Sequence, residues 1–150
     1  MGSLLAISQE LYWKEQKVML KYSYSKSVIA DSNNELFGNT ILQRSLKDYN
    51  GQTYWFSVNI NSFFKLDNSS FPKWLNFALG YSGNGMISAQ NKTGDNRYRQ
   101  FLFSLDVDLT RINTKNKFLK KLTHVFSFVK IPFPAFEFSN NQLKLHSIYF

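Results

Sequence analysis

The chain has 150 residues, a formal net charge of +8 and 17% aromatic residues. This aromatic content excludes a disordered chain, and the lack of any run of about 18 uncharged apolar residues argues against a bundle of membrane-spanning helices. The chain has no cysteine and only two histidines, so disulfides, thiolate metal sites and histidine-rich zinc sites are not expected. We expect neither a cofactor nor a metal.

Residues 1–16 predict an N-terminal helix. Apolar and small residues recur on one helical face of this segment, at Leu4, Leu5, Ser8, Leu11 and Tyr12. Two interpretations stay open: a short helix that packs on the domain, or a junction to an upstream half that is missing here. Residues 17–150 are expected to form a single β-rich domain.

Alternation of apolar and polar residues predicts antiparallel strands in six segments. These segments are 17–25, 54–64, 75–82, 101–110, 134–138 and 142–150. Residues 139–141 (Ser-Asn-Asn) predict a hairpin turn. Pro132 and Pro134 predict an edge position or an irregular start for the strand before that turn. The segments 86–90 and near Val28 are weaker candidates for further strands.

Two further helices are expected, over 36–47 and near 114–129. Asn113 or Thr114 is the expected cap of the second helix. This helix combines an apolar stripe with basic residues, which is typical of helices that lie in a membrane interface. The residues expected to contact anionic headgroups are Lys115, Lys117, Lys120 and Lys121. The alternative is a surface helix with its stripe packed on the sheet. No nucleic-acid motif accompanies the lysines, so no nucleic-acid partner is expected.

The two faces of the predicted strands differ. One face carries residues expected to contact lipid or a partner, namely Phe56, Val58, Phe77, Phe101, Phe103 and Val107. The other face carries Asn59, Asp106 and Asp108. Polar residues inside and aromatic residues outside are typical of a narrow membrane barrel. Aromatic residues near the strand ends could form its girdles, namely Tyr54, Trp55, Phe63, Phe64, Tyr81 and Tyr98.

The predicted fold class is therefore mainly β. We expect an antiparallel sheet, in the form of a small outer-membrane-type barrel or barrel-like sheet, with two or three amphipathic helices. The same alternation also fits a soluble sandwich or a sheet packed on helices. The sequence pattern leaves these alternatives open.

Asp106, Asp108 and His146 are the only catalytic candidates. Two carboxylates on one strand face could perform acid–base chemistry. The favoured alternative is an interior ion pair with Arg44, Arg111 or a lysine. His146, the adjacent Ser147 and a distant aspartate could form a triad, but no nucleophile-elbow motif accompanies any serine.

Several strings carry a family resemblance. They are residues 46–59 (LKDYNGQTYWFSVN), 71–76 (FPKWLN), 80–86 (GYSGNGM), 97–100 (RYRQ), 104–109 (SLDVDL) and the ending 148–150 (IYF). Together they resemble the C-terminal half of an uncharacterised family of Bacteroidetes envelope proteins, grouped with the predicted periplasmic lipoprotein YfiM. Residues 8–16 look like the junction to the N-terminal half of that family. The resemblance implies a cell-envelope location and no reaction.

The resulting hypothesis is a non-enzymatic structural or accessory subunit of the bacterial cell envelope, located at the outer membrane or its periplasmic face. Its expected partners are membrane lipid or lipopolysaccharide and other envelope proteins. The alternatives are an enzyme that modifies lipid or lipopolysaccharide, and a soluble periplasmic β domain that binds a ligand or a protein.

Overall fold

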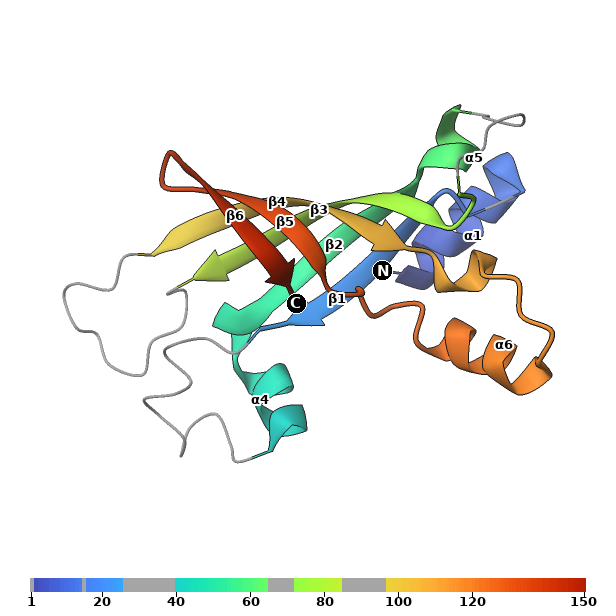
Figure 1. Cartoon of the computed structure of the whole chain (residues 1–150), viewed down its shortest axis with the longest axis horizontal. Coiled ribbons are helices and arrows are strands. Elements are labelled where there is room, and N and C mark those ends of the chain that lie inside the picture. The colour runs from blue at the N-terminus through green and yellow to red at the C-terminus, as the bar shows by residue number, and fades with distance from the viewer. Residues whose placement is uncertain (1, 15, 26–39, 65–71, 85–96) are drawn as a thin grey trace.

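The computed structural model describes residues 2–14, 16–25, 40–64, 72–84 and 97–150. One six-stranded antiparallel sheet dominates these residues (Figure 1), and its strand order follows the chain. The strands are β1 (Val18–Tyr24), β2 (Gln52–Asn59), β3 (Leu75–Asn84), β4 (Tyr98–Val107), β5 (Phe133–Ser139) and β6 (Gln142–Tyr149). The predicted mainly β, antiparallel class is confirmed.

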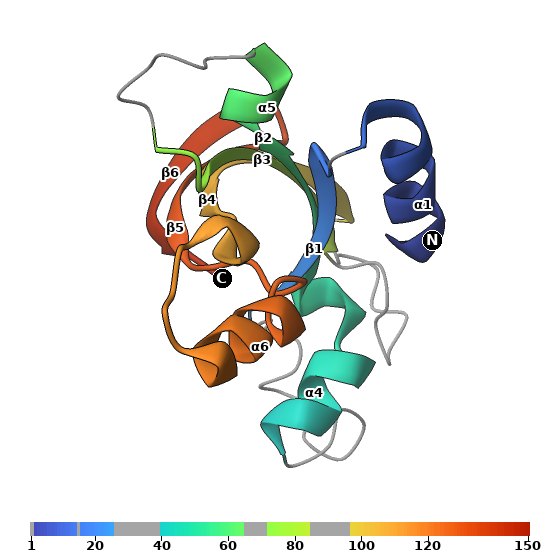
Figure 2. The same cartoon turned by 90° about the vertical axis from the view of Figure 1, so that its right-hand side faces the viewer.

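The sheet curls strongly, so that β1 and the β5–β6 hairpin lie on opposite sides of its hollow (Figure 2). It does not close into a barrel, because β1 and β6 do not pair with each other in the described part of the chain. The outer edge of β1 is instead covered by the connection that leads to β5. The backbone N–H of Tyr22 donates to the backbone carbonyl of Phe128 (2.8 Å), and the backbone N–H of Lys130 donates to the backbone carbonyl of Tyr22 (2.9 Å).

Four α-helices and two 3-10 turns lie in the described residues, against the two or three helices predicted. They are α1 (Gly2–Trp13), α4 (Ile41–Lys47), η1 (Tyr49–Gly51), α5 (Ile60–Phe64), η2 (Leu109–Arg111) and α6 (Lys117–Val125). None of the helices in the described ranges is long and apolar enough to cross a membrane. The predicted strands at 86–90 and near Val28 fall outside the described residues, as do residues 36–39, the start of the helix predicted over 36–47.

Two predicted strands end earlier than expected, because a polar side chain begins a helical turn. The side chain of Asn59 accepts the backbone N–H of Ser62 (2.9 Å), so the chain turns into α5 and the predicted strand 54–64 stops at Asn59. Asp108 accepts the N–H of Thr110 (3.0 Å) and caps η2, so the strand predicted to reach Thr110 stops at Val107.

The predicted cap of the basic helix is also wrong. Asn116 accepts the N–H of Phe118 (2.9 Å) and starts α6, which places its start two or three residues beyond the predicted Asn113 or Thr114. Helix α6 ends at Val125, four residues before the predicted end at 129. The residues after it form the backbone contacts with β1.

The β5–β6 hairpin explains why the end of the chain alternates poorly. Its turn is formed by Asn140 and Asn141, both in the left-handed region (φ 48° and 58°), as two-residue primed turns require. The pairing then shifts register between Phe133 and Ala135, at the position of Pro134. Such a bulge changes which residues point inward. The irregular strand start predicted from the prolines is therefore confirmed.

Candidate functional site

The outer face of the curled sheet is apolar and exposed. In β2 to β5 the burial alternates residue by residue, and the exposed positions are aromatic or aliphatic except for Arg99 near the start of β4. The fractional exposure is 51% at Phe56, 55% at Phe101 and 52% at Phe138. Single apolar residues are common on protein surfaces, but a large contiguous apolar patch marks a site that contacts protein, membrane or ligand. This sheet exposes its apolar residues.

Strand register joins these residues into continuous rows that cross the sheet. One row runs through all six strands as Tyr22, Tyr54, Tyr81, Phe101, Phe138 and Leu143. The next row runs as Leu20, Phe56, Leu79, Phe103, Phe136 and Leu145. Ring contacts hold neighbours together, with centroids 5.5 Å apart for Tyr81 and Phe101 and 5.6 Å for Phe77 and Phe103. The outer face is one apolar band.

The inner face is polar. Among the described residues, five buried hydrophobic residues stand against nineteen buried polar or charged ones. The hydrophobic cluster of the inner face consists of Trp55, Ala78, Leu102 and Ala135, with Tyr149 packed against it. Because buried polar groups require partners, the interior is a set of hydrogen-bond networks around this small cluster.

The first network is built on a fully buried ion pair. The Lys21 ammonium lies 2.7 Å from Oδ2 of Asp106, and neither side chain is exposed. Ser57 donates to the same carboxylate oxygen (2.6 Å), and Asn76 donates to Ser57 (2.9 Å). Asn59 then donates to Asn76 (2.7 Å). This chain of contacts connects β1, β2, β3 and β4 through their inner faces.

Lys130 reaches the interior from the connection between α6 and β5. Its ammonium donates to Ser104 (3.1 Å) and lies 4.4 Å from the centre of the Trp55 ring. Burial lowers the pKa of Lys130 to about 8, against the opposing effect of nearby Asp106, while Lys21 lowers it further. The Trp55 ring also fixes the neighbouring strand, since a Cβ at Gly80 would lie 2.7 Å from it. Only glycine fits beside this ring.

The second network lies at the β5–β6 hairpin. Glu137 contacts His146 at 2.7 Å, and it accepts hydrogen bonds from Ser139 (2.6 Å) and Gln100 (2.9 Å). Further along β6, Tyr149 contacts the hydroxyl of Thr53 (3.3 Å) across the interior. The sequence reasoning missed Glu137, although its inward phase on β5 could have indicated it.

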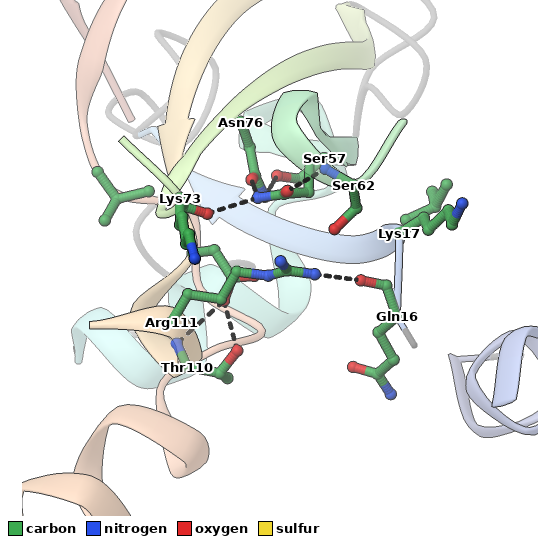
Figure 3. A network of polar contacts seen from close by, with 12 residues as sticks. Gln16, Lys17, Ser57, Ser62, Lys73, Asn76, Thr110 and Arg111 are labelled. Atoms are coloured by element: carbon green, nitrogen blue, oxygen red, sulfur yellow. Dashed lines mark hydrogen bonds and ion pairs between the residues drawn. The ribbon is translucent and has the colours of Figure 1, made fainter. Parts of the chain in front are cut away.

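The third group closes one end of the sheet (Figure 3). Arg111 donates to Asp108 (3.1 Å) and to the backbone carbonyl of Gln16 (3.1 Å), which ties η2 to the start of β1. Thr110 donates its hydroxyl to Asp108 (2.6 Å). Asp108 is thus held as a cap and as the partner of Arg111.

The three catalytic candidates have different partners: Asp106 pairs with Lys21, Asp108 with Arg111 and His146 with Glu137. The two carboxylates therefore make the interior ion pairs that were the favoured alternative to acid–base chemistry. In the described part of the chain, no group of three or more His, Cys, Asp or Glu residues could hold a metal ion.

The residues expected on the outer face mostly lie there. Phe56, Phe77, Phe101 and Phe103 are exposed, whereas Val58 and Val107 are half-buried. Of the expected girdle residues, Tyr54, Phe63, Phe64 and Tyr81 are exposed and Tyr98 is half-buried. Trp55 was placed wrongly, since it has no exposed surface and points inward. Its neighbour Tyr54 occupies the outward phase.

Helix α6 contributes a second exposed surface. None of its residues is buried, and Lys117, Lys120 and Lys121 are all exposed, as is Lys115 before it.

Comparisons of the chain with protein-family models, curated proteins and solved structures found no significant match. The family resemblance drawn from the sequence strings therefore stays a prediction.

Proposed function

We propose that this chain is a structural or accessory domain of the bacterial cell envelope whose outer sheet face contacts the lipid of the outer membrane. The observation that supports this most is the inverted distribution of residues on the sheet. Aromatic and aliphatic side chains occupy the exposed face, and an ion pair with its hydrogen-bond network occupies the buried one. Lipid covers an apolar outer face without any change of fold.

Strand length also agrees with this role. β3 and β4 have ten residues each, and at about 3.4 Å per residue such strands are about 34 Å long. With the tilt of about 35–45° found in membrane sheets, their height is about 26 Å, close to the apolar band of about 25 Å in such proteins.

A lipid environment places a demand on the edge of the sheet. Unpaired backbone groups are costly in hydrocarbon, so a sheet in lipid has to be closed or paired. The connection after α6 covers part of β1, whereas β6 has β5 as its one strand partner in the described residues. We infer that a strand of another envelope protein pairs with β6 and completes a barrel-like enclosure. This makes the chain a subunit of an assembly.

The role is non-enzymatic in this proposal. The polar groups that could perform chemistry are held in buried ion pairs and caps, as described for Asp106 and Asp108. Their partners come from the same fold, so in this proposal the two carboxylates hold the interior of the sheet together.

Detergent dependence tests the proposal directly. The purified chain should be monodisperse in a mild detergent and should aggregate once the detergent falls below its critical micelle concentration, as measured by light scattering and sedimentation. A chain that stays monomeric without detergent would overturn the lipid contact. A soluble, discrete oligomer would instead favour burial of the apolar band against protein.

A further inference from the structure

Helix α6 is amphipathic, with basic residues on one side and apolar residues on the other. At 100° per residue, the three lysines and His124 fall on one side, and the apolar residues fall on the other. The basic side borders an open surface hollow of about 610 Å³, lined by Lys117, Lys120, Lys121, His124 and Val125. The lining of this hollow is almost wholly apolar, so it consists of the aliphatic stems of these side chains and of Val125, while the lysine ammonium groups lie on the exposed surface around it.

The apolar side of α6 is not packed on the sheet. Phe118 is 67% exposed, Val125 is 61% exposed and Leu119 is 47% exposed. Leu122 and Thr123 are half-buried and form the more enclosed part of the helix. A surface helix that served only to cover the sheet would bury its apolar stripe, so this stripe has a different neighbour in the functional state.

The position of α6 fits a membrane interface. In the antiparallel order of the sheet, α6 follows β4 and lies at the end of the strands that also holds the start of β1. Figure 1 shows α1 and α6 at this same end. Arg111 fixes the end by its hydrogen bond to Gln16, and Phe126 and Phe128 continue the exposed apolar surface beyond α6.

We infer that α6 lies in the plane of the membrane interface and binds the phosphates of anionic lipid headgroups through Lys117, Lys120 and Lys121. Phe118, Leu119 and Val125 enter the boundary between headgroups and acyl chains. The inference rests on the proposed lipid contact of the sheet. It adds the class of lipid, which is anionic, and the end of the sheet at which that lipid binds.

The test uses the full chain in detergent, diluted into vesicles of phosphatidylcholine alone or with 30% phosphatidylglycerol. Flotation measures the fraction bound. The variant Lys117→Gln/Lys120→Gln/Lys121→Gln removes three charges, each worth about a fivefold gain in affinity near an anionic surface. We expect this variant to lose about 100-fold in affinity for the anionic vesicles and to bind neutral vesicles as the wild type does.

A matched control removes the same charge from the other end of the sheet. Lys47→Gln/Arg97→Gln/Lys144→Gln changes three exposed basic residues that lie outside α6. This control should keep the preference for anionic vesicles. Raising the salt from 50 to 500 mM should weaken wild-type binding to anionic vesicles and change the α6 variant much less.

The outcomes separate this inference from the proposed function. If both triple variants keep the same preference for anionic vesicles, the α6 assignment is wrong, even where the sheet still requires detergent. If the α6 lysines control vesicle binding in a chain that is monomeric without detergent, the helix binds lipid and the lipid-facing sheet is wrong. Lysine-dependent binding to a DNA oligonucleotide, with no preference among vesicles, would overturn the lipid assignment. Circular dichroism verifies that the variants are folded.

Discussion

The inner face of the sheet buries polar residues and the outer face exposes apolar ones, although the two kinds of residue alternate along the same strands. In β2, Phe56 is 51% exposed and apolar, whereas its neighbour Ser57 is fully buried and bonded to Asp106. The polar interior holds the strands to one another by directional contacts. The hydrophobic contacts of the apolar exterior are non-directional, so any hydrocarbon surface can cover it. The inner face therefore holds the strands together, whereas the outer face serves to contact another surface.

The largest effect is expected from breaking the inner face at Asp106→Asn. This change leaves the Lys21 ammonium buried without a counter-charge, and such losses cost about 3–5 kcal/mol. Unfolding of the protein in detergent, followed by tryptophan fluorescence, measures the loss. The double variant Lys21→Met/Asp106→Asn should recover part of the stability, because it removes the Lys21 charge together with its counter-charge and leaves Lys130 as the one remaining cation of this network. A loss below about 1 kcal/mol for the single variant contradicts the role of the ion pair.

A charge on the outer face tests the other half of the comparison. Phe103→Lys lies in the middle of the band and should cost about 2–4 kcal/mol in a bilayer. Phe138→Lys, next to the β5–β6 turn, is the control and should cost about 0–1 kcal/mol because it lies near the interface. Unfolding from vesicles measures both. Equal costs at the two depths, or improved solubility without detergent for Phe103→Lys, argue for a water-facing or protein-facing sheet.

Gly80→Ala tests the packing of the inner cluster. A Cβ at this position would lie 2.7 Å from the Trp55 ring, and overpacking of this kind costs about 1–3 kcal/mol. The cost should shrink in the background of Trp55→Phe, whose smaller ring leaves room, and a double-mutant cycle in thermal unfolding measures the difference. An unchanged cost in that background means that Trp55 is not the obstacle.

The smallest effect is expected at the hairpin turn. Asn141 has φ 58°, so Asn141→Ala should cost about 1 kcal/mol and Asn141→Gly should be close to neutral. Thermal unfolding of the two variants side by side gives the answer. If alanine and glycine behave alike, the left-handed turn does not hold the hairpin.

Much of the sheet could be predicted because its alternation is local. The outward phase of Phe56, Phe77, Phe101 and Phe103 follows from a period of two, and the same period places Asp106 inside. The strand ends could not be predicted in this way. They depend on whether Asn59 and Asp108 bond to the next turn instead of continuing the strand.

The partners inside the sheet were also beyond the sequence pattern. Lys21 and Asp106 are 85 positions apart in the chain, and only the register of four strands brings them together. The bulge at Phe133 and Ala135 moves Tyr149 inward and leaves Ile148 outside, which hides the alternation at the end of the chain. Trp55 was misplaced because it is an aromatic residue near a strand end, whereas the alternation of the strand points it inward.

The central claim, that the outer face contacts lipid, is tested most directly along β4. The chain has no cysteine, so single nitroxide-labelled cysteines can be placed at positions 100–105 and the protein reconstituted in vesicles. Collision rates with oxygen and with a water-soluble nickel complex then report the environment of each label. We expect high oxygen and low nickel accessibility at 101, 103 and 105, and immobile labels with low accessibility to both reagents at 100, 102 and 104. High nickel accessibility at 101 and 103 would contradict the account.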